Sequence, residues 1–388
     1  MQYRKFGKLD WQVSALGLGC MRFPAVEGDS NPMSSNIDEE KAIPMIRYAI
    51  DQGVNYIDTA YPYHGGNSEV VVGKALQEGY REKVKLATKS PVWLIKKPED
   101  FDTLLDEQLE KLQTDHIDFY LLHSLYKKMW TDTILKHDIL AKAEKAVQDG
   151  RIKYIGFSFH DDYDCFETII DGYDKWDFCQ IQYNYMDTDN QAGTKGLKYA
   201  AEKGIPIVIM EPLLGGRLAY PPKSIEDIFQ GADKKASPVD WALQWLWNQP
   251  EVSVVLSGMS SLEQIKENLH SAELSGIDSL GQEELKLIDS VHLKYKERTA
   301  IPCTSCNYCM PCPSNVDIPG VFGFYNQGFM HEDVEGARGG YARNISEKKR
   351  ANKCIQCRIC EEKCPQKITI SQWMPKVQGV LGEGKGYE

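Results

Sequence analysis

Residues 84–123, VKLATKSPVWLIKKPEDFDTLLDEQLEKLQTDHIDFYLLH, contain one complete strand–helix–strand unit. The short apolar and β-branched runs at 84–89 and 117–123 predict two strands. Between them, apolar residues recur at the spacing of one helix face: Phe101, Leu104, Leu105, Leu109 and Leu112. Such a unit is typical of a parallel sheet covered by helices.

The same alternation continues on both sides of this unit, from residue 15 to about residue 270. Eight strands are predicted, at 16–19, 54–58, 84–89, 117–123, 153–158, 178–182, 206–210 and 252–257. Eight repeats predict an α/β protein with a closed (β/α)8 TIM barrel. The alternative is an open doubly wound sheet, but the G-x-G-x-x-G turn of that fold is absent after the first strand. Residues 1–13, with the turn Gly7-Lys8-Leu9-Asp10, predict a hairpin closing the barrel floor.

Eight of the eleven cysteines form two regular runs near the C-terminus. The runs are Cys303-x2-Cys306-x2-Cys309-x2-Cys312-Pro313 and Cys354-x2-Cys357-x2-Cys360-x3-Cys364-Pro365. The second run has the spacing of bacterial ferredoxins, and the first differs from it by one residue. Paired C-x2-C motifs also build zinc sites, and a disulfide framework is a further alternative, but quartets of cysteines favour two [4Fe-4S] clusters.

In the ferredoxin spacing, the fourth cysteine of each run binds the cluster of the other run. One cluster is therefore predicted at Cys303, Cys306, Cys309 and Cys364. The other is predicted at Cys354, Cys357, Cys360 and Cys312. The remaining thiols have no partners at ligand spacing and are expected to be buried or in loops: Cys20, Cys165 and Cys179.

The chain is long enough for a barrel and a second domain. We expect a barrel over 1–275, a linker helix over 276–300, and a small, mainly helical, ferredoxin-like dicluster domain over 301–388. No run of about 20 apolar residues is present, which argues against a membrane-spanning protein. The net charge of -11 and the lack of a basic stripe argue against nucleic-acid binding. The first six residues lack the apolar core of a secretory signal, so a cytoplasmic location is expected.

Ionisable side chains stand at or just after the ends of three consecutive predicted strands. They are Asp58 with Tyr63, Lys89 and His123. The ends of neighbouring parallel strands lie close together at the barrel mouth, so these groups are expected to converge. The structural alternative is four unrelated roles: a helix cap, loop packing, a solvated lysine and a histidine bonded to backbone.

The segments that carry these residues resemble the aldo-keto reductases. They are Asp58-Thr-Ala-Tyr61-Pro-Tyr63, Thr88-Lys89, Leu121-Leu122-His123 and Gly156-Phe157-Ser158. The resemblance covers residues 1 to about 275 and implies that Tyr63 is a general acid toward an aldehyde or ketone. Lys89, held by Asp58, is expected to lower the pKa of Tyr63, and a neutral His123 to orient the carbonyl oxygen.

The resemblance also implies NADP or NAD bound across the barrel mouth. The implied contacts are Gly19, Cys20, Met21, Asp58, Ser158, Gln180, Met210, Ser257, Gly258, Met259, Gln264 and Asn268. Met210 stands where many relatives have an aromatic ring. Many NADPH-dependent relatives carry Lys and Arg where this chain has Gly258 and Gln264, so NADH remains an alternative.

Three functions follow from these features. The complete set of four polar residues favours a reductase of carbonyl compounds (or dehydrogenase of alcohols) whose clusters are structural or regulatory. The second is an electron-transfer oxidoreductase whose clusters exchange electrons with a ferredoxin or flavoprotein. The third is a sensor with an inactive barrel. The aromatic residues expected near the mouth suggest a substrate wall or simple loop packing: Phe23, Tyr61, Trp93 and Tyr126.

Overall fold

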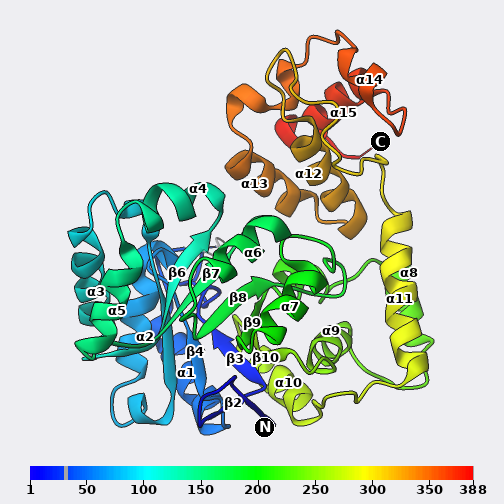
Figure 1. Ribbon diagram of the computed structural model, residues 1–388. Coiled ribbons are helices and arrows are strands. Elements are labelled where there is room, and N and C mark those ends of the chain that lie inside the picture. Colours follow the sequence, from blue (N-terminus) through cyan, green and yellow to red (C-terminus); the bar gives the residue numbers. More distant parts are fainter. Residues whose placement is uncertain (30–33, 388) are drawn as a thin grey trace. The chain divides into compact units, whose positions relative to one another are not determined.

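The computed structural model describes residues 1–29 and 34–387. Within these residues, eight parallel strands close into a barrel in the order β10-β3-β4-β5-β6-β7-β8-β9 (Figure 1). The strands are β3 (Leu16–Gly19), β4 (Tyr56–Asp58), β5 (Lys85–Ser90), β6 (Ile117–Leu125), β7 (Ile152–Phe159), β8 (Phe178–Gln182), β9 (Ile207–Met210) and β10 (Val252–Gly258). The predicted barrel is confirmed, and each strand lies within two residues of its predicted bounds.

A layer of helices surrounds the strands (Figure 1). It consists of α1 (Glu39–Asp51), α2 (Asn67–Ala75), α3 (Glu99–Leu112), α5 (Ile139–Gln148), α6 (Tyr163–Asp171), α7 (Gly193–Glu202), α9 (Pro238–Trp247) and α10 (Leu262–Glu273), with the short α4 (Lys127–Met129) after β6. The apolar stripe of α3 illustrates the packing, since Phe101, Leu105 and Leu112 are almost fully buried. The main core therefore lies between the helices and the outer face of the strands.

A hairpin closes the N-terminal end of the barrel, as predicted. β1 (Tyr3–Lys5) and β2 (Gln12–Ser14) pair antiparallel, and the connection between them carries Phe6. The Phe6 ring lies inside the barrel, 5.0 Å from the ring of Phe119 on β6. Aromatic packing on the barrel axis excludes water from this end.

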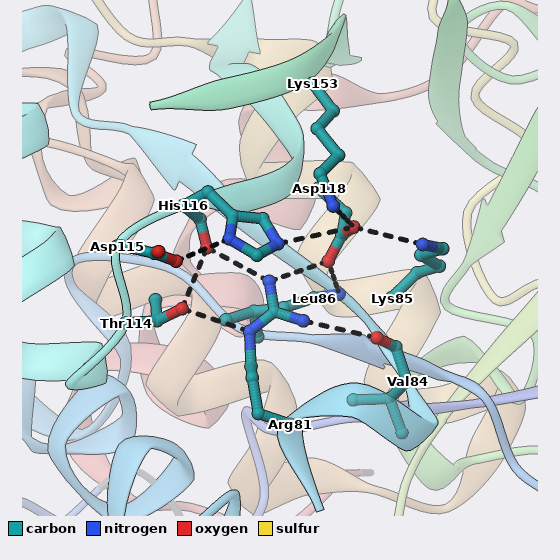
Figure 2. A network of polar contacts seen from close by, with 9 residues as sticks. All are labelled: Arg81, Val84, Lys85, Leu86, Thr114, Asp115, His116, Asp118 and Lys153. Atoms are coloured by element: carbon teal, nitrogen blue, oxygen red, sulfur yellow. Dashed lines mark hydrogen bonds and ion pairs between the residues drawn. The ribbon is translucent and has the colours of Figure 1, made fainter. Parts of the chain in front are cut away.

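A buried carboxylate joins three strands near the same end (Figure 2). Asp118 is the second residue of β6, and its Oδ2 accepts hydrogen bonds from Nη2 of Arg81 at 2.8 Å and from the backbone N–H of Leu86 at 3.0 Å. Its Oδ1 lies 3.1 Å from Nζ of Lys153 and 3.4 Å from Nζ of Lys85. Burial raises the pKa of Asp118, but these donors lower it more, so its pKa lies below the ordinary value. The network is a structural feature of the barrel floor.

The chain divides into two compact units. One consists of Met1–Leu218 and Val239–Gln282, and the other of Ala219–Pro238 and Glu283–Glu388. The helix α8 (Lys223–Gln230), which lies between β9 and α9 in sequence, therefore belongs to the second unit.

The second unit is helical. After α11 (Gln282–Glu297) come α12 (Ile318–His331), α13 (Val334–Asn344), α14 (Ile359–Lys363) and α15 (Ile370–Glu383). Its core is separate from the barrel cores and includes Phe322, Tyr325, Met374 and Val377. The predicted helical C-terminal region is thus present. Among the helices described, none combines the length and hydropathy needed to cross a membrane.

Candidate functional site

Four polar side chains meet at the C-terminal end of the barrel strands. Asp58 ends β4, Lys89 lies on β5 and His123 on β6, while Tyr63 begins the short turn of 3-10 helix that follows β4. Nζ of Lys89 lies 2.6 Å from Oδ1 of Asp58 and 3.4 Å from the hydroxyl of Tyr63. The rings of Tyr63 and His123 meet edge to face, with centroids 6.1 Å apart. The expected convergence is therefore observed.

Lys89 carries its charge in a buried site. Its side chain is 1% exposed, and Nζ also donates to the carbonyl of Thr59 at 2.8 Å. Burial lowers the pKa of Lys89, but the negative charge of Asp58 and the contact with Tyr63 raise it above the ordinary value. The ammonium is consequently retained at neutral pH beside the Tyr63 hydroxyl.

The other two groups are held in their neutral forms. Burial raises the pKa of Tyr63, and the opposing effect of Lys89 does not overcome it. The expected lowering of this pKa is therefore not seen, and the phenol keeps its proton at neutral pH. Burial, with the nearby charge of Lys89, places the pKa of His123 well below the ordinary value. Nδ1 of His123 is buried and has no hydrogen-bond partner among the described residues.

A buried polar layer behind Lys89 was not anticipated. Nε2 of Gln108 donates to the carbonyl oxygen of Lys89 at 3.1 Å, and Oε1 of Gln108 accepts from the hydroxyl of Tyr120 at 2.7 Å. Glu69 accepts from both Gln108 and Thr88. These bonds fix the backbone of β5. The available signal was Gln108 itself, a polar residue on the apolar stripe of α3.

Two predicted cofactor contacts face each other on neighbouring strands. Ser158 of β7 and Gln180 of β8 are register partners, and both are buried. Oγ of Ser158 accepts from the backbone N–H of Ser124 at 2.7 Å. Oε1 of Gln180 has no partner in the described part of the chain. A buried, unpaired oxygen is a site for a ligand donor such as a carboxamide. The next strand end carries Met210, which is half-buried.

The first loop and the last strand supply further predicted contacts. Gly19 ends β3 and pairs in register with Asp58 and with Gly258. The backbone N–H of Cys20 donates to the carbonyl of Asp58 at 2.8 Å, and the half-buried Met21 follows it. A Cβ atom at Gly258 would lie only 3.0 Å from Cγ of Arg22. Arg22 is thus a cation beside Gly258 that the sequence motifs did not identify.

The remaining predicted contacts gather between β10 and α10. Nδ2 of Asn268 donates to Oγ of Ser257 at 2.9 Å, and both side chains are buried, as is Met259. Oε1 of Gln264 accepts from the backbone N–H of Ser260 at 2.8 Å. Apart from Gln180, in the middle of β8, the predicted contacts with a dinucleotide therefore lie at or near a strand end or in the loop or helix that follows.

The eight cysteines line two cavities in the second unit. One is lined by Cys303, Cys306, Cys309 and Cys364. The other is lined by Cys312, Cys354, Cys357 and Cys360. Each cavity thus takes three cysteines from one run and one from the other. Ile318 and Ile370 line both cavities, so the two sites are neighbours. Of the other three, Cys20, Cys165 and Cys179, each is buried, as expected.

Two protein-family models match the chain. The aldo/keto reductase family model matches residues 15–292, and a 4Fe-4S dicluster domain model matches residues 302–369. The probable aldo-keto reductase 1 of Glycine max is 27% identical over 301 residues, which cover 68% of this chain and 82% of that protein. The uncharacterized oxidoreductase YqkF of Bacillus subtilis (strain 168) is 28% identical over 75% of this chain and 96% of its own length.

Among solved structures, the holo form of the aldo-keto reductase AKR11C1 from Bacillus halodurans has the same barrel. It superimposes with a TM-score of 0.61 at 27% identity, over 75% of this chain and 96% of that chain. The family model alone accounts for more than half of the chain. This protein is therefore a member of the aldo/keto reductase family with a 4Fe-4S dicluster domain at its C-terminal side.

Proposed function

We propose that the protein is an NAD(P)-dependent oxidoreductase that interconverts an aldehyde or ketone and the corresponding alcohol at the barrel mouth. The observation that carries this proposal is the contact of the Lys89 ammonium with Asp58 on one side and with the Tyr63 hydroxyl on the other. When bound, a reduced nicotinamide supplies the hydride.

The residues of the chain supply and control the proton. Tyr63 holds its proton at neutral pH and donates it to the carbonyl oxygen as that oxygen gains negative charge. The phenolate that remains is stabilised by the ammonium of Lys89, which Asp58 holds in place. His123 is neutral, so it orients the carbonyl oxygen by hydrogen bonding without adding a competing acid. In alcohol oxidation the proton returns to Tyr63.

The residues around these four side chains suit a nicotinamide dinucleotide. The unpaired Oε1 of Gln180 and the hydroxyl of Ser158 fit a carboxamide, whose N–H and C=O groups match them. Gln264 offers no charge to a 2′-phosphate, but Arg22 beside Gly258 does. We therefore propose that both NADPH and NADH are accepted.

Turnover by the protein purified without oxygen tests this proposal. NADPH and NADH oxidation is followed with a panel of aldehydes and ketones. Tyr63→Phe should lower kcat by about 10²- to 10⁴-fold, the usual contribution of a general acid, while dinucleotide affinity stays the same. Tyr220→Phe is the matched control, because Tyr220 is 78% exposed. Unchanged turnover of Tyr63→Phe would exclude the mechanism.

We further propose that the two cysteine cavities hold one [4Fe-4S] cluster each, with the ligands divided as the cavities divide them. Thiolates are the ligands of such clusters, and each cavity takes three cysteines from one run and one from the other, which is the division that the ferredoxin spacing predicts. Burial raises the pKa of Cys309 and of Cys360 to about 11, so cluster assembly must release protons from these thiols. Thiol ligands require a reducing compartment, which favours the cytoplasm.

A second function, one-electron exchange at the clusters with a ferredoxin or flavoprotein, is favoured by one observation. Cys306 and Cys357 are exposed, one on each cavity, so each cluster reaches solvent. Replacement of Cys357 by Ser should abolish reduction of a one-electron acceptor such as a viologen dye and spare carbonyl reduction. If both activities persist after cluster loss, the clusters have no part in either.

A further inference from the structure

One segment of the second unit reverses the charge of the chain. Residues 343–367 carry eight Lys and Arg against three Glu, whereas the whole chain has a net charge of -11. This segment includes the loop that contributes Cys354 and Cys357 to their cavity and the helix α14, which contributes Cys360. A local excess of positive charge on an acidic protein attracts anionic partners. It also repels other copies of the acidic chain less strongly than the rest of the surface does.

Three cations of this segment are available for binding, because Lys353, Arg358 and Lys363 are exposed. Arg358 lines the cavity itself. Lys353 precedes Cys354, and Lys363 ends α14, the helix that carries Cys360. Within residues 1–29 and 34–387, no ion pair joins any of the three to a carboxylate, whereas Arg298 and Arg338 of the same unit are paired with Glu332 and Glu335. Burying three unpaired cations against a partner therefore breaks no ion pair within the chain.

Apolar side chains stand among these cations. Ile355 is 68% exposed and Ile359 is 43% exposed, and they lie on either side of the exposed Cys357 in sequence. We call Lys353, Ile355, Arg358, Ile359 and Lys363 the cationic face. Apolar contacts with charges around them are the usual composition of a specific protein interface.

Among the described residues that line the other cavity, none is charged, and its exposed lining includes Thr304, Asn307 and Gln366. Arg358 thus distinguishes the lining of the site of Cys312, Cys354, Cys357 and Cys360, so this site is the one that favours an acidic partner.

We propose that the cationic face docks a small acidic electron-carrier protein of the ferredoxin type. The proposal rests on the proposed occupation of the cavity by a [4Fe-4S] cluster. The reduced carrier passes one electron to that cluster, so the carrier is oxidised by one electron and the cluster is reduced by one; no proton or bond is involved. Cys357 provides the exposed edge, the cations steer the carrier toward it, and the two isoleucines give the short-range contact.

The test uses the full-length, cluster-loaded protein and a dithionite-reduced plant-type [2Fe-2S] ferredoxin as the probe. Stopped-flow absorbance follows ferredoxin oxidation as a function of ionic strength. The second-order rate constant should fall steeply as salt rises. In the triple variant Lys353→Gln/Arg358→Gln/Lys363→Gln, the rate constant at low salt should fall about tenfold or more, and its salt dependence should largely disappear.

Two controls separate the effect of the removed charges on the rate constant from the effect of cluster loss. Lys136→Gln/Lys198→Gln/Lys266→Gln removes three exposed cations from the barrel and should react like the parent protein. Iron content and the EPR spectrum of the reduced cluster should be the same in all proteins compared. An equal rate in the two triple variants overturns the cationic face alone. A protein that assembles no cluster overturns this proposal together with the proposed cluster sites.

Discussion

Nζ of Lys89 lies 2.6 Å from Oδ1 of Asp58, and both side chains are removed from solvent, with exposures of 1% and 3%. In an ion pair of this kind, the free-energy cost of removing each charge from water is offset only by its attraction to the other charge. The pair also keeps the ammonium next to Tyr63. Loss of one partner should therefore affect both stability and catalysis, whereas loss of both should affect mainly catalysis.

Replacement of Asp58 by Asn should lower the free energy of unfolding by about 3–5 kcal/mol, since it leaves the Lys89 charge buried without its counter-ion. Urea unfolding measures this loss. The double variant Asp58→Leu/Lys89→Met should recover most of the stability and none of the carbonyl reduction. Equal stability of the single and double variants would show that the pair is not desolvated as described.

His123 should make stability depend on pH. Its pKa in the folded protein lies well below 6.5, the value expected when unfolded. The unfolded chain therefore takes up a proton as the pH falls through about 6.5, and the folded chain does not. The contribution of His123 to stability is thus complete above that pH and is lost below it. The loss of stability between pH 7.5 and 5.5 should be about 1 kcal/mol smaller in His123→Gln. His270→Gln, at a side chain 72% exposed, is the control variant.

The crossed arrangement of the cysteines predicts in which double variants the losses of iron add up. Cys364→Ala and Cys303→Ala affect the same cavity, so the double variant should retain about four iron atoms, as each single variant does. Cys364→Ala with Cys354→Ala affects both cavities and should retain almost none. Iron analysis and EPR of the reduced proteins measure the outcome. The reverse pattern would mean that each run holds its own cluster.

The carboxylate at the barrel floor should support stability without affecting catalysis. Asp118→Asn weakens the bonds to Arg81 and Lys153 and should cost about 2–3 kcal/mol at pH 7. Because the pKa of Asp118 is depressed on folding, its contribution is present above the unfolded value of about 3.9 and is lost as the pH falls through the folded value. The two proteins should thus converge in stability toward pH 3, with kcat unchanged. Asp115→Asn, at a side chain 92% exposed, is the control.

The sequence alone determined the barrel, because strand and helix periods follow from which residues are buried along a continuous stretch of chain. It also identified Asp58, Tyr63, Lys89 and His123, since strand ends in such a barrel meet at one place. The cysteine runs predicted three ligands of each quartet from local spacing, and the crossing of the fourth cysteine came from the ferredoxin pattern.

Only the tertiary structure decided the environment of those residues. The pKa of Tyr63 is raised because burial outweighs Lys89, and the extent of burial depends on segments far apart in sequence. The support of β5 by Gln108 and Glu69 likewise depends on two helices packing against one strand. The placement of α8 in the second unit had no local signal. A periodic pattern indicates that a residue is buried. The residues that it contacts in the core are set by the packing of the whole fold.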